Sequence, residues 1–345
     1  MMKTFSWIIV LIASGLALTS CEHDVSMETT VHEDGSLDKV IRFHGLDSVK
    51  AIMNLKESSG WKRNVIRHRQ PDSAHVTKTT LEWTKTFASA EEANKELAAT
   101  SDTLFRVSST FVKKFRWFYT YIHYADTYHA INRMKLSVED YVTPEDYAFI
   151  DRLPAEGKTI SRADSLYLSE LNKKLFDVYG LKAVFDEYYA LDIELIKKNE
   201  VDRKWLDTLN KYKNHLFLEM GRGKESEDGF GLRLLDSLHI PLPYEQLVKQ
   251  YKEMSKPTES KTNFISTANE GKYVNRIDMP WEIVATNADS IVMGNVALWH
   301  PPVTKFLIKD YTMYAEARRM NYWAVALSAA LIGLTFYLFL RQRSS

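Results

Sequence analysis

The sequence has almost no cysteine and no excess of either sign of charge. Cysteine occurs once among 345 residues, as Cys21, which excludes a disulfide bond within the chain and any zinc site built from cysteines. The 45 basic residues equal the 45 acidic ones in number, so the composition gives no electrostatic sign of a nucleic-acid partner. The folded protein must therefore depend on core packing, and a chain of this length can bury a sufficient core.

Catalytic motifs are also missing in their usual forms. The sequence contains no Gly-x-Ser-x-Gly, His-Glu-x-x-His, Walker or calcium-loop pattern. His123 and His129 lie in one extended run, but six residues along a strand separate two side chains by about 20 Å, which is too far to share a metal. We therefore expect a protein without enzymatic activity, cofactor or metal, with an unrecognised envelope hydrolase as the less favoured alternative.

The N-terminus has the pattern of an export signal. A single charge, Lys3, precedes an uncharged segment from Thr4 to Ser20, and the chain turns polar directly after Cys21. A basic start, a short apolar core and small residues at the cut are typical of a secretory signal peptide. Leu18-Thr19-Ser20-Cys21 also resembles the bacterial lipobox. That resemblance implies cleavage between Ser20 and Cys21, removal of residues 1–20, and a lipid on the thiol of Cys21.

A second apolar segment lies near the C-terminus. Tyr322 to Leu340 contains no charged residue, and nineteen helical residues rise about 28 Å, close to the thickness of the hydrocarbon core of a bilayer. Tyr322, Trp323 and Tyr337 suit the interfacial aromatic belts of a spanning helix. The sequence therefore predicts a transmembrane helix over residues 321–340.

The two anchors together predict a location. Because the signal peptide exports the body of the protein, we expect the main domain on the periplasmic side of a bacterial inner membrane and the short tail, 341–345, in the cytoplasm. The expected lipid partners are the acyl anchor and the bilayer around the helix. Ala329, Ala330 and Gly333 leave a flat strip on that helix where a membrane-protein partner could approach closely.

Between the anchors, the hydrophobic period predicts an α+β fold. Alternation of period two occurs in residues 21–129 and again in 264–320, whereas residues 130–257 follow the helical period. We expect one antiparallel β-rich domain made from the two outer segments, with an inserted all-helical block and a linker at 258–263. Three consecutive domains are the alternative.

Two local signals refine the helical block. Thr143-Pro144-Glu145 predicts a helix start, with proline at the first helical position. Ser161 is expected to start another helix that runs to Tyr179 and ends at Gly180.

The unusual stretch of the β-rich part is Phe115 to Tyr124, within an extended run from Leu104 to Tyr128. Period two places Trp117, Tyr119 and Tyr121 on one face, and bulky residues occupy the other face as well. We therefore expect a strand covered on both sides. One interpretation is a central core strand, and the other is the wall of an apolar cavity in which these three residues bind a ligand.

The late strands resemble a known family. Met279-Pro280-Trp281-Glu282-Ile283-Val284, then Thr286-Asn287-Ala288, then Gly294 to Trp299 (GNVALW), is similar to the closing segment of LppM-type bacterial envelope lipoproteins. Those proteins usually have a glycine where this sequence has Trp281. The resemblance implies an α+β, partly barrel-like body that holds a lipid-like ligand; the helical insertion has no counterpart in it.

These observations favour a non-enzymatic, membrane-anchored envelope lipoprotein that binds a lipid-like ligand or a membrane partner near the bilayer. The alternative is a scaffold or assembly subunit of an envelope complex, in which the helical insertion docks other proteins.

The lipobox prediction can be tested by metabolic labelling with radioactive palmitate. The unaltered chain is expected to take up label, and Cys21→Ser is expected to abolish it, because the substitution removes the only thiol. An unlabelled parent protein would contradict the prediction.

Overall fold

The computed structural model describes residues 23–44, 53, 55–69, 77–98, 103–199, 202–222, 229–269 and 271–343. The predicted signal peptide and the predicted lipidation site, Ser20 and Cys21, lie outside these residues. The fold is mixed α+β, and the chain divides into two compact units. We call them the sheet unit (up to His129, with 270–303 and 310–345) and the helical unit (130–269 with 304–309).

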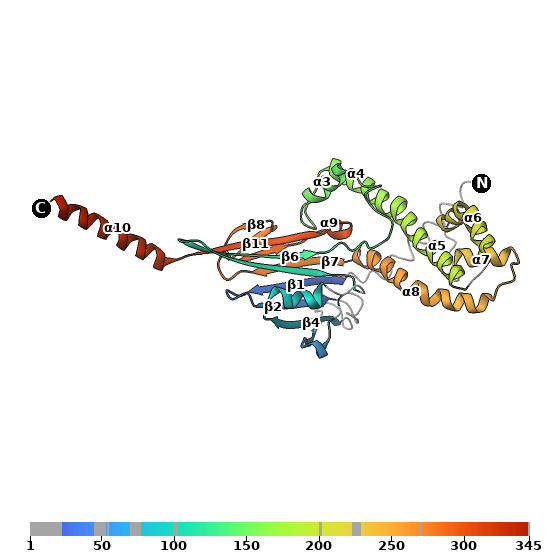
Figure 1. The fold of residues 1–345 in the computed structure, drawn as a ribbon, viewed down its shortest axis with the longest axis horizontal. Coiled ribbons are helices and arrows are strands. Elements are labelled where there is room, and N and C mark those ends of the chain that lie inside the picture. The colour runs from blue at the N-terminus through green and yellow to red at the C-terminus, as the bar shows by residue number, and fades with distance from the viewer. Residues whose placement is uncertain are drawn as a thin grey trace. The chain divides into compact units, whose positions relative to one another are not determined.

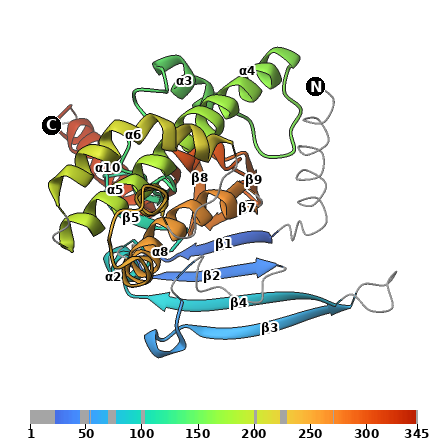
Figure 2. The same cartoon turned by 90° about the vertical axis from the view of Figure 1, so that its right-hand side faces the viewer.

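The described residues of the sheet unit form two sheets. One has seven strands in the order β3-β4-β2-β1-β7-β10-β9, and the other has four in the order β5-β6-β11-β8. The first four strands of the larger sheet lie side by side in Figure 2. The strands are β1 (His23–Val31), β2 (Leu37–His44), β3 (Lys62–Arg69), β4 (Thr77–Phe87), β5 (Val107–Phe115), β6 (Tyr119–Tyr128), β7 (Gly271–Asp278), β8 (Glu282–Thr286), β9 (Ser290–Val292), β10 (Val296–Trp299) and β11 (Tyr311–Met320). Two short helices, η1 (Glu57–Ser59) and α2 (Ala90–Leu97), accompany them.

Most strand pairs are antiparallel, as the sequence predicts, but one is not. β1 pairs with β7 in parallel, with Met27 opposite Asn275. A parallel pair needs a long crossover connection, and here the connection between the two strands includes the whole helical insertion. β1 and β2 form an antiparallel hairpin in which Val31 lies opposite Leu37, and Gly35 adopts a φ of 94° in its turn.

The two sheets face each other across a shared core. Burial alternates along β2, so that Leu37, Lys39, Ile41 and Phe43 are buried. Lys39 therefore occupies a core position although its side chain carries a charge.

Lys39 and Asp126 form an ion pair between the sheets in which neither side chain is exposed. Lys39 Nζ lies 3.0 Å from Asp126 Oδ1 and 3.2 Å from Oδ2, and it also donates to Thr29 Oγ1 at 3.0 Å. Ser109 Oγ and Tyr124 OH donate to Asp126 Oδ1 at 2.6 Å and 2.7 Å. Burial and the charge of Asp126 raise the pKa of Tyr124 well above its ordinary value, so the phenol remains a donor. Both charges are thus compensated by direct hydrogen bonds.

The long aromatic run is not a single strand. Arg116 N donates to Tyr119 O at 2.7 Å and Tyr119 N donates to Arg116 O at 3.1 Å, so Trp117 and Phe118 form a tight turn between β5 and β6. The sequence missed this turn because its two central residues are aromatic rather than Gly, Asn or Asp, which usually mark such turns.

The prediction that this run is covered on both faces is also wrong. Thr120, Ile122 and Tyr124 are buried on the inner face of β6, whereas Tyr119 and Tyr121 are half-buried on the other face. The bulky residues around the turn belong to an exposed tip, because the chain reverses there instead of continuing through a core.

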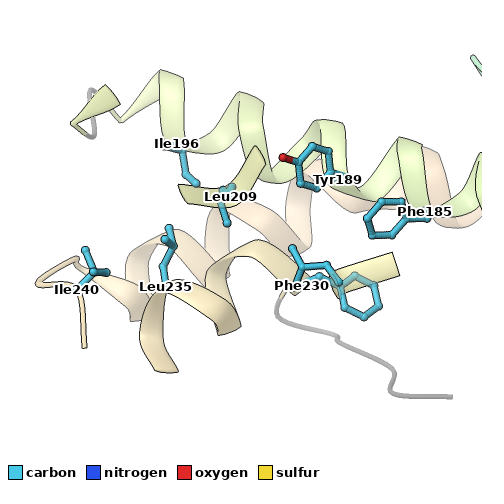
Figure 3. Packing of buried hydrophobic residues seen from close by; sticks show 8 residues of the cluster. Phe185, Tyr189, Ile196, Leu209, Phe230, Leu235 and Ile240 are labelled. Carbon is cyan, nitrogen blue, oxygen red and sulfur yellow. The ribbon is translucent and has the colours of Figure 1, made fainter. Parts of the chain in front are cut away.

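The helical unit consists of helices (Figure 1) that bury one apolar face each against their neighbours. Its elements are α3 (Pro144–Arg152), α4 (Arg162–Asn172), the π-helical segment η2 (Lys173–Gly180), α5 (Leu181–Lys198), α6 (Arg203–Gly221), α7 (Phe230–Ser237), α8 (Tyr244–Asn269) and α9 (Thr304–Leu307). The predicted start of α3 is confirmed by a capping box between Thr143 and Asp146. Figure 3 shows how side chains from α5, α6 and α7 converge in its core, among them Phe185, Leu209 and Leu235.

Two predicted boundaries in this unit are wrong. Ser161 caps α4 as expected, but Gly180 does not end the helix, because η2 connects α4 to α5 without interruption. The predicted linker, 258–263, lies inside α8, and so do residues 264–269, which were expected in the β-rich part. Buried residues on both sides of Pro257, such as Tyr251 and Phe264, keep one apolar stripe, and tertiary packing along it outweighs the missing hydrogen bond of the proline.

The C-terminal helix α10 (Tyr322–Arg343) is long and apolar enough to cross a membrane. Its side chains are mostly exposed in the folded chain, including Leu331, Ile332 and Phe336. A helix that is apolar on all sides yet unburied is typical of a transmembrane span rather than of a core helix.

The buried ion pair predicts a specific pattern of stability. Lys39→Met alone and Asp126→Leu alone are each expected to lower the free energy of unfolding by about 3–5 kcal/mol, because each leaves one buried charge without its counterion. The double variant should cost clearly less than the sum of the two. Denaturant unfolding followed by tryptophan fluorescence measures all three, and strictly additive losses would contradict the assignment.

Candidate functional site: an apolar cavity in the helical unit

The π-helical segment η2 spans Lys173–Gly180, between α4 and α5. Segments of π-helix widen the helix locally and occur frequently at functional sites. Here the segment is long, and its residues carry both buried side chains, Leu175 and Tyr179, and exposed ones such as Asp177. It therefore presents an irregular surface to the rest of the unit.

Gly180 is required by this geometry. A Cβ atom at position 180 would lie 3.0 Å from the carbonyl oxygen of Leu175, which is closer than an ordinary van der Waals contact. A larger residue would have to displace the backbone of the π-helical turn. The glycine thus permits a π-helical turn at the position where the sequence predicted the end of a helix.

A cavity of about 650 Å³ opens beside η2, entirely within the helical unit. Its size lies within the range typical of small-molecule sites. Most of its lining side chains are apolar, and they come from η2, the start of α5, the end of α8 and the segment after α9. The lining residues are Asn132, Met134, Leu175, Phe176, Asp177, Tyr179, Gly180, Leu181, Val184, Met220, Thr262, Ile265, Ser266, Asn269, Leu307 and Ile308.

The cavity combines a buried floor with an accessible rim. Leu175, Tyr179 and Leu307 are buried, whereas Asp177 and Ser266 are exposed. A ligand could therefore enter from solvent and bury an apolar part against the floor. The polar rim would hold a headgroup or a carboxylate in water.

The polar groups of the floor are engaged with each other. Asn132 Nδ2 donates to the Tyr179 hydroxyl at 2.7 Å, and that hydroxyl donates to the carbonyl of Leu136 at 2.9 Å. Burial raises the pKa of Tyr179, so the hydroxyl keeps its proton. Because the pair satisfies itself, the floor favours an apolar ligand over one that needs hydrogen bonds.

A buried ion pair fixes α5 against α8 near the cavity. The carboxylate of Glu187, of which 3% is exposed, lies 3.1 Å from Lys261 Nζ and accepts a hydrogen bond from the backbone N–H of Lys135 at 2.7 Å. Val184 and Thr262, one helical turn or less away, line the cavity. The pair therefore holds two walls of the cavity at a fixed separation.

Asp192 of α5 is another buried carboxyl of this unit. Its Oδ2 accepts a hydrogen bond from Gly231 N at 2.8 Å, at the start of α7. A Cβ atom at Gly229 would lie 2.6 Å from Oδ1 of Asp192, so glycine is needed for this approach. Burial raises the pKa of Asp192 to about 7, although the backbone N–H groups of Gly231 and Leu232 oppose the shift.

This carboxyl is placed for a structural role. A pKa near neutrality is typical of general acids and bases, but Asp192 is not exposed and does not line the cavity. Its hydrogen bonds satisfy N–H groups in the first turn of α7, which otherwise lack partners. Among the residues that the structure describes, no group of three or more His, Cys, Asp or Glu side chains could hold a metal ion.

The structure places the predicted ligand residues elsewhere. Trp117 lies in the β5–β6 turn and is 44% exposed, and Tyr119 and Tyr121 follow it on β6. The cavity is lined by other residues, and ligand binding by these three stays a prediction. The sequence did not predict Leu181 and Val184 as cavity residues. Gly180 lies inside a continuous apolar pattern, and this combination could have indicated the π-helical turn instead of a helix end.

Comparison with known proteins does not assign this chain to a family. No protein-family model matches the chain, and no curated protein matches its sequence. Among solved structures, the chain is similar to the NMR structure of the folded domain of LppM from Mycobacterium tuberculosis, with 9% identity, covering 87% of this chain and 91% of that one. The TM-score is 0.26, and a similarity of that size carries no argument about fold or function.

Asp192 predicts how the stability of the helical unit depends on pH. Its folded-state pKa of about 7 lies above the ordinary value of 3.8, so the folded protein keeps a proton that the unfolded chain loses. The contribution of Asp192 to the free energy of unfolding is therefore fully present below about pH 4. It falls by up to roughly 4 kcal/mol as the pH rises from about 4 to about 7.

Asp192→Asn should flatten this pH dependence, because it cannot ionise but retains an oxygen acceptor for the N–H of Gly231. The measurement is hydrogen exchange in α5 and α7 at several pH values, corrected for intrinsic rates. Asp207→Asn, at an exposed position, serves as the matched control. An unchanged pH profile in Asp192→Asn would refute the prediction.

Proposed function

We propose that this protein is a non-enzymatic, membrane-anchored envelope lipoprotein whose helical unit binds a lipid-like ligand. The observation that supports the proposal best is the apolar cavity beside η2, because its floor is apolar and its own polar groups are satisfied. An acyl chain fits such a floor, and its polar end fits the exposed rim.

Membrane attachment is the second part of the proposal. α10 supplies one anchor by its length and composition, and the lipobox-like segment ending at Cys21 would supply the other. The body would then lie on the periplasmic side of a bacterial inner membrane, with the C-terminal tail in the cytoplasm. A protein held at the bilayer surface has direct access to lipids as ligands.

Photo-crosslinking tests ligand binding at residue level. The full chain is reconstituted in nanodiscs with a fatty acid that carries a photoreactive diazirine, and the crosslinked peptides are mapped by mass spectrometry. We expect crosslinks in two places: in α10, from the surrounding bilayer, and in η2 and the end of α8, from the cavity.

Val184→Trp should fill the cavity and remove most of the crosslinking in η2 and α8 while leaving that in α10 unchanged. Leu218→Trp is the matched control, because Leu218 is 57% exposed on α6 and does not line the cavity. Crosslinks confined to α10, or crosslinks in η2 that survive Val184→Trp, would exclude the cavity as the binding site.

A further inference from the structure

The β5–β6 turn is fastened to the start of α10 by one residue, Asn321. This side chain is 6% exposed, and its Nδ2 donates to the carbonyls of Arg116 and Trp117 at 2.8 Å and 3.1 Å. Its Oδ1 accepts from Thr120 Oγ1 at 2.8 Å, and its backbone N–H donates to Phe118 O at 2.8 Å. The Asn321 carbonyl accepts from Ala324 N in the first turn of α10. The turn and the helix are therefore held in a fixed arrangement.

Trp117 extends from this turn along the side of α10. Its indole Nε1 donates to Ser328 Oγ at 2.8 Å, and its ring centroid lies 5.5 Å from that of Trp323. Ser328 is six positions beyond Tyr322, which corresponds to about 9 Å along the helix axis. When α10 spans a bilayer, the indole consequently lies below the membrane surface. An N–H group at that depth needs a partner within the protein, and Ser328 supplies one.

The tip is apolar and exposed. Phe115, Trp117 and Phe118 are 59%, 44% and 47% exposed, and Phe115 stacks on Trp323 with centroids 6.0 Å apart. A cluster of exposed aromatic side chains next to a transmembrane helix is typical of the membrane interface, where the rings contact acyl chains and carbonyls.

Basic side chains surround this tip. Lys114 and Arg116 are exposed on either side of Phe115, and Arg318 and Arg319 are exposed at the end of β11, directly before α10. Arg319 pairs with Glu33 at 2.7 Å, and Arg318 lies over the ring of Tyr119. Lys114 and Arg116 are therefore the side chains best placed to meet phosphate groups at the level of the lipid headgroups.

We propose that the aromatic side chains of the β5–β6 turn, Phe115, Trp117 and Phe118, insert into the bilayer beside α10, and that Lys114 and Arg116 bind the phosphates of anionic lipids. The inference rests on the membrane anchoring in the proposed function, but not on the cavity, whose residues belong to the helical unit. It makes the aromatic run a membrane-docking element that fixes the orientation of the sheet unit on the bilayer.

Depth-dependent fluorescence quenching tests insertion. In a Cys21→Ser background, a single cysteine replaces Phe118, Val65 or Leu334 and is labelled with bimane, and the full chain is reconstituted in nanodiscs with brominated phosphatidylcholine. The label at 334, in α10, is the positive control for a position inside the bilayer. The label at 65, on the exposed face of β3, is the negative control for a position in water. We expect quenching at 118 and 334 but not at 65.

Quenching at 334 without quenching at 118 would overturn the inference and leave the membrane anchor intact. Absence of quenching at both positions would overturn the anchoring and the inference together. In neither case is crosslinking to the cavity affected, so failure of ligand binding is measured separately.

Replacing brominated phosphatidylcholine with brominated phosphatidylglycerol tests the headgroup contact. The label at 118 should be quenched more strongly by the anionic lipid, and each basic side chain removed should lower that preference about fivefold. Lys114→Gln with Arg116→Gln should thus remove most of it, whereas the control pair Lys62→Gln with Arg63→Gln on β3 should leave it unchanged. Equal quenching by the two lipids in the parent protein would refute anionic lipid binding.

Discussion

The sheet unit depends on one buried ion pair. Lys39 of β2 and Asp126 of β6 are unexposed and lie 3.0 Å apart between the two sheets. A shift of either strand by one residue would turn its charge to the opposite face, leave the partner buried alone and turn the apolar residues of that strand outward. The pair and the apolar pattern therefore favour the same register of β2 and β6.

In both units, buried polar side chains form ion pairs or hydrogen bonds that fix how neighbouring helices and strands pack. In the helical unit, Glu187 and Lys261 hold α5 against α8 beside the cavity, and Asp192 holds the start of α7. The cavity lies beside η2, whose geometry departs from that of an α-helix. The Glu187–Lys261 pair holds two of its walls, whereas Asp192 does not line it.

The aromatic run shows why one pattern supported two interpretations. Tryptophan, tyrosine and phenylalanine suit both a core strand and the wall of an apolar cavity, and the sequence does not reveal a chain reversal when the turn itself consists of aromatic residues. In the structure, Trp117 and Phe118 form a turn that the hydrogen bonds of Asn321 attach to the start of α10. Phe115 and Phe118 are exposed because the chain reverses at this turn instead of continuing through the core.

The sequence alone determined the α+β class, the apolar C-terminal helix and the caps of α3 and α4, because period, length and capping chemistry are local properties. It did not reveal the parallel pairing of β1 with β7, the turn at Trp117 and Phe118, the continuation through Gly180 or the pairing of Lys39 with Asp126. Lys39 stood at an inward position of β2 and Asp126 at one of β6, but each was a charge without a visible partner. Residues 87 positions apart become neighbours only when two sheets pack, and the cavity likewise forms only where α5, η2 and α8 meet. Those features were decided by the tertiary structure, because they depend on contacts between segments that the local sequence pattern does not encode.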